Sequence, residues 1–460
     1  MPFLSSGTDV FSPFPFPSAC PCPCPSPNYL PKQTVVSLGL RPPENAAWSE
    51  MSSQNNQTLD QLLASPEVYN NPYPIYHRLR REAPVHWSDA WNSWVLTRYD
   101  DVVFVLRNHT RFINAGRVAK FLEQLPASVL NEIRPLYENF TVGMPNSDPP
   151  EHTRVRGLVN KAFTPRVVEG MRPRVQAIVD ELLDAVEDAG EMDVVRDFAY
   201  PLPAIVIAET LGIPPEDREQ FKKWSDDIVA FHGTGRPDVD TARRSNRGLL
   251  KAKAWLLPIL EERRRRPRND LFSGLVAAEA QGDVLSEAEL LATCITLLVG
   301  GHETTTGLIG NGLLALLRHP DQLQKLRGDP TLIKTAVEEI LRYDTSFQRA
   351  WRLIAEDVEV GGKLLRKDQT VSVMLGAANR DPTHFPDPDR LDITRTPNRH
   401  VSFGVGIRFC AGAPLGRREA EIAFTTLLRR FPGLRLSDKG IAWQQNNTFH
   451  NLKSLPVVLS

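Results

Sequence analysis

The chain has 460 residues, of which 41% are hydrophobic and 24% are charged, and its formal net charge is −1. This charge balance excludes the strongly basic composition that is typical of nucleic-acid-binding proteins. The longest strongly apolar stretch, Leu290 to Gly301, is too short to span a bilayer, so we expect no membrane anchor. The five cysteines form no disulfide framework, and we therefore expect a reducing, cytoplasmic location.

Residues 1–56 are predicted to form a disordered tail, and residues 57–460 a single folded domain. Eleven of the 38 prolines lie in the first 45 residues, so neither a helix nor a sheet can continue there. The cysteines at positions 20, 22 and 24 are two residues apart, which is not the CxxC spacing of a metal or redox site.

The first half of the folded part predicts a series of short elements followed by longer helices. We expect a helix ending at Pro84, a hairpin turning near Asp89–Asn92, a helix over 100–108, and a helix after Pro149 and Pro150. Residues 110–147 have less periodicity and are interpreted as a loop that covers the substrate. Residues 166–280 are predicted to be mostly helical, with a break at 233–238, and residues 431–460 to form terminal strands.

The longest predicted helix lies between Ser286 and His319. Ser286 and Glu289 have the spacing of a capping box, and Pro320 ends the pattern. Its middle segment, LLATCITLLVGG, is apolar on every side, which predicts that this helix runs through the core.

The sequence GGHETTTG follows that apolar segment inside the same helix. Gly300 and Gly301 weaken the helix, and the hydroxyl of Thr304 can bond back to the carbonyl of Gly300, so we expect a local opening. Glu303 beside Thr304 is an unusual choice for packing in a buried helix. The pair is therefore a candidate for chemistry rather than for packing.

A ten-residue segment near the C-terminus, FGVGIRFCAG from Phe403 to Gly412, holds a lone cysteine among glycines. The segment after Cys410 is a good helix former, so Cys410 should lie just before a helix N-terminus, where the helix dipole favours a thiolate. No second cysteine lies within zinc spacing. A single thiolate as the only protein ligand of a metal suits haem iron.

The spacing Phe-Gly-x-Gly-x-Arg-x-Cys-x-Gly resembles the haem-binding loop of the cytochrome P450 family. Gly-Gly-x-Glu-Thr resembles the oxygen-activation motif of that family, and Glu339-x-x-Arg342 its buried ion pair, with Arg390 at the place of a third member. The segments DPPEHTR and GAPLGRREAE resemble its soluble bacterial type. The resemblance implies a mainly α fold with a small β part, in which haem lies between the long helix and the helix after Cys410.

The resemblance also implies a role for individual residues. Cys410 would ligate the iron, Thr304 and Glu303 would be catalytic, and Glu339, Arg342 and Arg390 would be structural. Residues that would bind the haem are His152, Arg156, Arg352, His400, Phe403, Arg408, Cys410 and Gly412. Residues that would contact the substrate are Thr296, Val299, Gly300, Gln348, Ala350 and Phe449.

The implied function is a monooxygenase that inserts one oxygen atom of O2 into a small hydrophobic substrate by means of heme b. Electrons would come from a ferredoxin or flavodoxin with an NAD(P)H-dependent reductase, and we expect a monomer. A basic face formed by Arg154, Lys161, Arg166, Arg417 and Arg418 would receive the acidic electron donor. Two alternatives stay open: a peroxide-using or isomerising haem-thiolate enzyme, and a non-catalytic haem-binding sensor.

Overall fold

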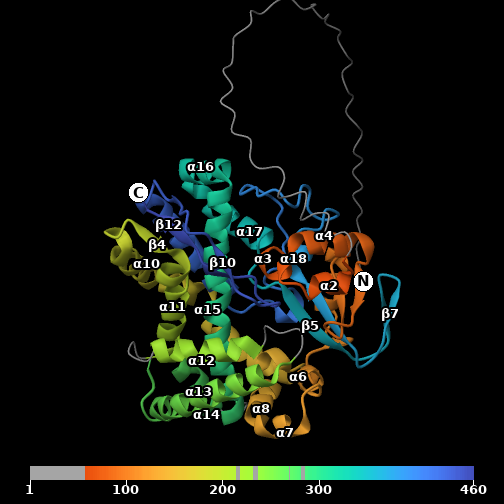
Figure 1. The fold of residues 1–460 in the computed structure, drawn as a ribbon. Helices are drawn as coiled ribbons and strands as arrows, with labels where there is room; N and C mark the ends of the chain where they lie inside the picture. The colour runs from red at the N-terminus through yellow and green to blue at the C-terminus, as the bar shows by residue number, and fades with distance from the viewer. Residues whose placement is uncertain (1–56, 214–217, 232–236, 269, 281–284, 460) are drawn as a thin grey trace, which may run out of the picture. The chain divides into compact units, whose positions relative to one another are not determined.

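The computed structural model describes residues 57–213, 218–231, 237–268, 270–280 and 285–459. The predicted tail 1–56 and most of the predicted break at 233–238 lie outside these residues. Within them the chain is mainly helical with small sheets, as the sequence predicted (Figure 1).

The N-terminal part forms short helices around a hairpin. The helices are α2 (Leu59–Leu63), α3 (Glu67–Asn70), α4 (Tyr73–Glu82) and α5 (Tyr99–Arg107). Strands β1 (Val85–Ser88) and β2 (Ser93–Leu96) pair antiparallel between α4 and α5, and Asn92 in their turn has a φ of 47°. The helices at both ends of the hairpin and the turn between its strands are therefore confirmed.

The prediction of a loop over residues 110–147 was wrong. After the short strand β3 (Phe112–Ile113), this segment forms α6 (Arg117–Leu122), α7 (Ala127–Glu132), α8 (Arg134–Val142) and a 3-10 turn. Each of these helices has only six to nine residues, and prolines stand at the starts of α7 and α8. Helices this short present too few turns for a clear apolar period, which is why the sequence pattern concealed them.

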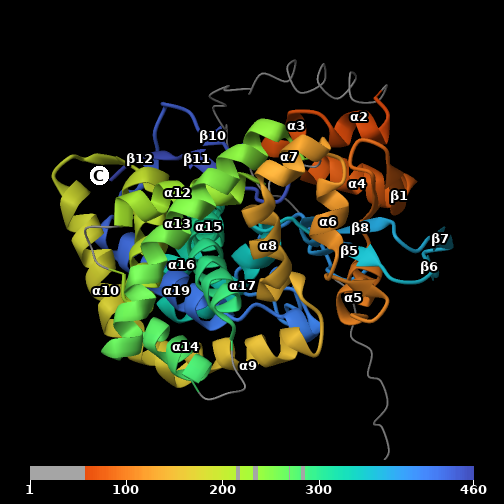
Figure 2. The ribbon, with the colours of Figure 1, turned by 90° about the horizontal axis from the view of Figure 1, so that it is seen from below.

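The middle of the chain is helical, as predicted. Its helices are α9 (Glu151–Ala162), α10 (Pro165–Glu187), α11 (Pro201–Leu211), α12 (Arg218–Ala230), α13 (Val239–Arg265) and α14 (Leu271–Ala280). A short strand, β4 (Glu191–Asp193), and a π-helical turn over Val194–Ala199 connect α10 to α11. Helices α8, α12, α13 and α14 all pack against the central helix. They surround the end of it that lies lowest in Figure 1 and nearest to the viewer in Figure 2.

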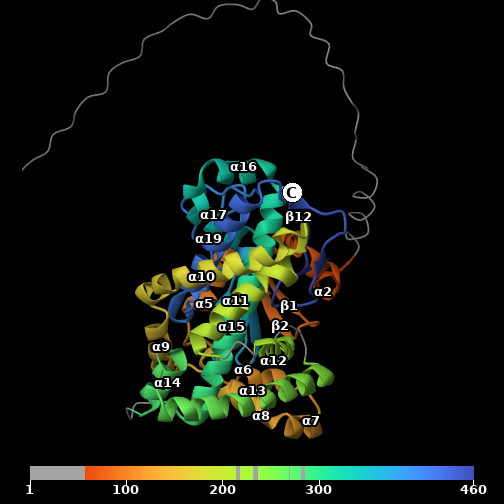
Figure 3. The ribbon, with the colours of Figure 1, turned by 90° about the vertical axis from the view of Figure 1, so that its left-hand side faces the viewer.

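The central helix is α15 (Glu287–Arg318), which has 32 residues and agrees closely with the predicted bounds. The capping box is present: Ser286 N–H donates to Glu289 Oε2 at 2.8 Å, and Glu289 N–H donates to Ser286 Oγ at 3.3 Å. Figures 1 and 3 show α15 running through the middle of the helices, with α11 beside it. Among the described residues, no helix combines the length and the apolar character needed to cross a bilayer.

The helix α15 stays α-helical through Gly300 and Gly301, so the predicted opening does not interrupt it. The Thr304 hydroxyl does donate to the Gly300 carbonyl, at 3.2 Å. Gly301 serves packing instead, because a Cβ there would lie 2.7 Å from the side chain of Ile207 on α11. The two glycines therefore have different roles.

The C-terminal part supplies most of the strands. The main sheet has the order β1-β2-β8-β5-β3, with β2 and β8 parallel and the other neighbours antiparallel. Its later strands are β5 (Arg349–Ile354) and β8 (Thr370–Met374), and a separate pair is β6 (Val358–Val360) with β7 (Lys363–Leu365). The predicted terminal strands are present as β9 (Arg435–Leu436), β10 (Ala442–Trp443), β11 (Leu452–Ser454) and β12 (Pro456–Val458).

Four further helices complete the described chain: α16 (Pro320–Gly328), α17 (Ile333–Tyr343), α18 (Leu375–Ala378) and α19 (Ala413–Arg430). Helices α17 and α19 pack against α15 and against each other. Gly312 on α15 permits this contact, because a Cβ there would lie 2.7 Å from side-chain atoms of Ile340 and Phe424. This packing fixes the start of α19 relative to α15.

A buried ion pair on α17 anchors the irregular segment that leads to Cys410. Glu339 and Arg342 are both fully buried, and the guanidinium donates to both carboxylate oxygens at 2.8 Å. Arg342 also donates to backbone carbonyls of that segment, those of Asn379, Pro388 and Arg390. One side chain thus binds three points on a stretch that has little regular structure.

The third member of this network is Arg395, and the prediction of Arg390 was wrong. Arg395 Nε lies 3.1 and 3.2 Å from the two carboxylate oxygens of Glu339, whereas the side chain of Arg390 is exposed. A turn in which Arg395 N–H donates to the Asp392 carbonyl, at 2.9 Å, brings the later arginine inward.

We predict that Arg395→Ala lowers the free energy of unfolding by about 2–4 kcal/mol, because it removes a partner of a buried carboxylate. The matched variant Arg390→Ala keeps the backbone carbonyl that accepts from Arg342 and should change stability by less than about 0.5 kcal/mol. Chemical denaturation of both variants measures the difference. Equal destabilisation by the two substitutions would contradict the assignment.

Candidate functional site

The loop before α19 closes on itself around Cys410. Gly404 and Gly406 have φ angles of 68° and 75°, in the left-handed region that favours glycine. The Cys410 N–H donates to the Phe403 carbonyl at 2.9 Å, and α19 begins three residues later. The predicted position of Cys410, just before a helix N-terminus, is therefore confirmed.

Cys410 keeps accessible surface as a residue, while protein atoms surround its thiol. Burial raises the pKa of this thiol, while the N–H groups of Gly412 and Ala413 and the charges of Arg156 and Arg417 act in the opposite direction. The sequence predicted that the helix N-terminus would favour a thiolate, but burial is the larger effect. Coordination by a metal ion would supply the missing stabilisation of the thiolate.

A cluster of cationic side chains gathers near this loop from four parts of the chain. We call it the cationic cluster, and its members are Arg117 at the start of α6, His152 and Arg156 on α9, Arg352 on β5, and Arg408 in the cysteine loop. The sequence had predicted four of these five residues. Arg117 was missed because it lies in the segment interpreted as a loop.

The charges in the cationic cluster disfavour one another. Burial, reinforced by the charges of Arg408 and Arg156, lowers the pKa of His152 to about 4. Burial and the charge of Arg408 likewise lower the pKa of Arg352 to about 10. A carboxylate among these groups is that of Asp148, which accepts a hydrogen bond from Arg408.

Polar atoms of the cationic cluster also lack partners. Within the described part of the chain, Nδ1 of His152 and Nε of Arg408 are buried without a hydrogen bond. Arg352 donates to the carbonyl of Trp351, at 2.8 Å. Unpartnered donors and mutually repelling cations fit a ligand with two carboxylates, and haem carries two propionates. The residues present therefore fit the group that the sequence predicted.

His400 does not fit the haem-binding role that the sequence predicted for it. Its Nδ1 accepts from the Ser402 N–H at 3.2 Å, so Nε2 carries the proton and faces Glu338 at 3.1 Å. Both ring nitrogens are thus used within the protein. Phe403 is half-buried, and the guanidinium of Arg417 lies 4.5 Å above its ring.

The helix α15 has an open face in its middle. Thr296, Gly300 and Thr304, spaced four residues apart, all retain accessible surface, and so does Val299. A Cβ added to Gly300 would meet no heavy atom within 4 Å. On α19, a Cβ added to Gly416 would lie 3.4 Å from Oγ1 of Thr305, so α19 approaches α15 next to this open face. The helix that follows Cys410 is thus held against α15 beside its open face.

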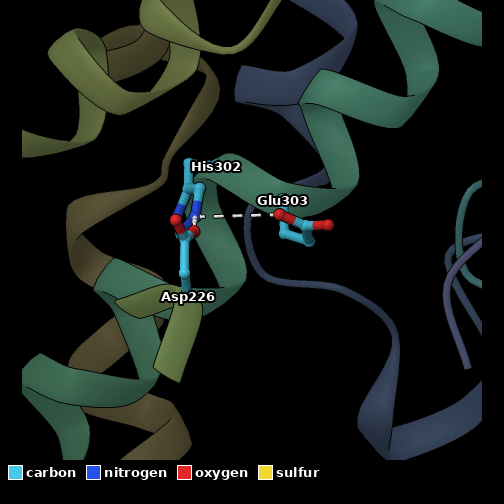
Figure 4. Close-up of side chains that lie close together, drawn as sticks. All are labelled: Asp226, His302 and Glu303. Atoms are coloured by element: carbon cyan, nitrogen blue, oxygen red, sulfur yellow. Dashed lines mark ion pairs between the residues drawn. The ribbon is translucent and has the colours of Figure 1, made fainter. Parts of the chain in front are cut away.

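Glu303 lies on a different side of α15 from Thr304 and is buried. Its Oε1 accepts from the Asn451 amide at 2.9 Å, and its Oε2 lies 3.9 Å from Nε2 of the buried His302 (Figure 4). His302 is a residue for which the sequence predicted no role. The signal that could have found it is a histidine beside the Glu-Thr pair at the end of an apolar run.

Of the six predicted substrate residues, three lie on the open face of α15 and three are buried elsewhere. Thr296, Val299 and Gly300 share the open face of α15. Gln348 is buried elsewhere, and its amide donates to the Thr345 carbonyl at 2.7 Å and to the Tyr73 hydroxyl at 3.3 Å, so it is not available to a substrate. Ala350 and Phe449 are each 9% exposed.

A separate pocket of about 340 Å³ lies between the β1–β2 hairpin, α6, α8 and β5. Large aromatic side chains line much of it: Trp87, Trp91, Phe121, Phe140, Phe231 and Trp351. Arg117 of the cationic cluster lies at its wall and stacks on Trp351 at 4.8 Å. Polar and charged side chains, among them Lys120, Arg349 and Asp368, line the rest, so the pocket suits a molecule that has both an apolar and a polar part.

Comparison with known proteins gives matches along most of the chain. The family model described as cytochrome P450 matches residues 118–441. Cytochrome P450 CYP107DY1 of Priestia megaterium is 43% identical and covers 86% of this chain and 98% of its own length. For 6-deoxyerythronolide B hydroxylase of Saccharopolyspora erythraea the identity is 39%, with coverage of 86% and 98%. The solved structure of P450BioI, in complex with an acyl carrier protein ligated to hexadec-9Z-enoic acid, has a TM-score of 0.80 at 39% identity, covering 86% of this chain and 100% of that one.

We predict that Arg156→Ala increases the rate of haem loss about tenfold, the effect of removing one charge-assisted hydrogen bond. Transfer of haem from the purified protein to an excess of apomyoglobin measures that rate. The matched control is Arg154→Ala on the same helix, because Arg154 pairs with Glu289 outside the cationic cluster. Haem loss at the wild-type rate in Arg156→Ala would remove Arg156 from the haem site.

Proposed function

Because the chain belongs to the cytochrome P450 family of haem-thiolate monooxygenases, we propose that it inserts one oxygen atom of O2 into a small hydrophobic organic substrate. The observation that carries this proposal is the position of Cys410. It lies directly before α19, the helix that packs against α15 beside the open face, and Arg156 of the cationic cluster is near its thiol. A thiolate ligand, a donor set for two carboxylates and an open helix face are what such a reaction needs in one place.

We propose that the cofactor is heme b, held by Cys410 through its iron and by the cationic cluster through its propionates. When bound, it supplies the electron transfer and the O2 activation that no side chain can perform. The chain's own contribution is to hold the thiolate, to neutralise the propionates and to keep the region beside α15 apolar.

The reaction consumes protons that the protein has to deliver. In RH + O2 + 2 e⁻ + 2 H⁺ → ROH + H2O, one oxygen atom leaves as water, which requires two protons. Thr304 presents its hydroxyl at the open face of α15, and Glu303 is the adjacent acid. We infer that this pair transfers the protons. The pair favours an O2-dependent reaction over the peroxide-using alternative.

The open face of α15 and the aromatic side chains in the 340 Å³ pocket support a hydrophobic substrate. Thr296, Val299 and Gly300 offer a surface with few polar atoms, and the pocket offers aromatic walls. The relatives agree in kind: one is named for a hydroxylation of 6-deoxyerythronolide B, and P450BioI was solved with a hexadecenoyl carrier protein.

We propose that a separate ferredoxin or flavodoxin, with an NAD(P)H-dependent reductase, supplies the electrons. The basic face expected to receive it carries less net positive charge than the sequence suggested. Arg154 pairs with Glu289, Arg417 with Glu338, and Arg418 with Glu169 and Glu421. We therefore expect only a modest dependence of the electron-transfer rate on ionic strength.

Replacing the thiolate tests the proposed ligand. In Cys410→Ser, the red-shifted carbon-monoxide band of the reduced protein should be lost, because the shift requires electron donation from a thiolate sulfur, which a serine oxygen does not provide. The control is Cys294→Ala, since Cys294 is the other described cysteine and is buried in the core. If Cys410→Ser kept the band, Cys410 would not be the ligand and the proposed function would fail.

Thr304→Ala should still consume O2 and reduced nicotinamide, but most of the reducing equivalents should appear as hydrogen peroxide rather than as product. Glu303→Gln should slow O2 consumption itself, because it removes the acid that exchanges protons. Simultaneous measurement of O2, peroxide and product separates the two effects. Full coupling in Thr304→Ala together with uncoupling in Thr305→Ala would assign the role to Thr305.

A further inference from the structure

His302, beside Glu303, has a fixed tautomer and an unused nitrogen. Nδ1 lies 3.0 Å from the Leu298 carbonyl, and because a carbonyl only accepts, Nδ1 carries the proton. In the neutral imidazole, Nε2 then presents a lone pair. The residue is 2% exposed, and among the described residues Nε2 has no hydrogen-bond partner. A buried polar atom of this kind needs a functional or structural reason.

Two carboxylates face that nitrogen. Oδ1 of Asp226, on α12, lies 4.0 Å from Nε2 of His302, and Oε2 of Glu303 lies 3.9 Å from it (Figure 4). The side chain of Asp226 is 51% exposed, whereas that of Glu303 is 6% exposed. The three residues thus connect solvent to the buried acid next to Thr304.

Neighbouring side chains hold both carboxylates in place. The Tyr200 hydroxyl donates to Oδ1 of Asp226 at 3.2 Å, and the Tyr200 ring lies edge-on to His302 with centroids 5.5 Å apart. The Asn451 amide donates to Oε1 of Glu303 at 2.9 Å and to its backbone carbonyl at 3.1 Å. The Asn451 amide leaves Oε2 of Glu303 directed at His302.

We propose that His302 carries protons from Asp226 to Glu303 during turnover, an inference that rests on the proposed role of Glu303 and Thr304. Asp226 takes a proton from water. Its O–H bond then breaks as an N–H bond forms at Nε2 of His302. That N–H bond breaks in turn as an O–H bond forms at Oε2 of Glu303. Asp226 and His302 return to their starting states, and the net change is one proton moved from solvent to Glu303.

The geometry suits this transfer because one atom performs both steps. Nε2 accepts from one carboxyl and donates to the other, so the ring need not turn and Nδ1 keeps its bond to Leu298. The distances of 3.9 and 4.0 Å exceed a hydrogen bond by about 1 Å. A small approach of either side chain, or one water between them, closes that gap.

The same three side chains would suit a divalent cation, since imidazole and carboxylates are common ligands. We favour proton transfer because a cation bound to Glu303 would occupy the acid that the reaction needs. Metal analysis of the purified holoenzyme decides this point. Less than a tenth of an equivalent of zinc per chain is expected, and a full equivalent that is absent in Asp226→Asn would overturn the proposal.

The kinetic test uses Asp226→Asn, which keeps the shape of the side chain and removes its acid. We expect O2 consumption with saturating substrate and reductase to fall about tenfold, with a larger solvent isotope effect. Asp226→Glu should restore the wild-type rate. The matched control is Asp227→Asn on the same helix, where the carboxylate faces Arg244 instead of His302.

Rates of O2 consumption in these variants distinguish a failure of the relay from a failure of the proposed role of Glu303. If Glu303→Gln slows O2 consumption while Asp226→Asn and His302→Gln do not, the relay is wrong and the proposed role of Glu303 stands. If Glu303→Gln also turns over at the wild-type rate, the proposed role of Glu303 is itself wrong. Should the buried His302→Gln fail to fold, the exposed Asp226→Asn still decides.

A second readout observes the tautomer of His302 directly. In the reduced, carbon-monoxide-bound holoprotein labelled with ¹⁵N-histidine, nuclear magnetic resonance should show His302 with a protonated Nδ1 and a bare Nε2 at neutral pH. Asp226→Asn should leave that tautomer unchanged while slowing O2 consumption, which a merely structural effect on His302 would not do. A protonated Nε2 with a bare Nδ1 would overturn the relay.

Discussion

Electrostatic repulsion among the residues of the cationic cluster is the constraint on which the rest of the site depends. Four guanidinium groups lie close together near the carboxylate of Asp148, and burial removes the water that would screen them. The imidazole of His152 lies among them, and their charges help to keep it neutral by lowering its pKa to about 4. Such a cluster is stable only with added negative charge. Haem propionates would supply it, so haem binding and the stability of this region are linked. The raised pKa of the Cys410 thiol adds to this link, because iron would stabilise the thiolate that burial disfavours.

The central helix shows how one element serves several purposes through its faces. Thr296, Gly300 and Thr304 leave one face open, and Gly301 allows close contact with α11. Glu303 and His302 lie on other faces and have partners on the C-terminal segment and on α12. Glu303 and His302, which a buried helix would normally exclude, each face a polar side chain of another element. The same helix therefore forms part of the core and part of the site, through different faces.

The sequence predicted the parts of the structure that depend on local rules. The capping box at Ser286 and Glu289, the turns at Gly404 and Gly406 and the helix after Pro150 follow from short-range geometry, and the structure confirms them. The wrong or missing predictions depend on contacts between distant segments. Arg395 rather than Arg390 reaches Glu339 because of a turn. Gln348 donates to the Tyr73 hydroxyl. The role inferred for His302 depends on Asp226, which lies on another helix. Spacing along the chain does not specify such contacts.

Arg342 anchors the segment before the cysteine loop in a way that allows the side chains of that segment to change. Arg342 and Arg395 bind that segment through backbone carbonyls, those of Asn379, Pro386, Asp387, Pro388 and Arg390. Every residue has a carbonyl, so this kind of recognition does not depend on which side chains the segment carries. The outer surface of the segment can therefore accept new side chains, and with them new contacts to other proteins, while Cys410 keeps its place.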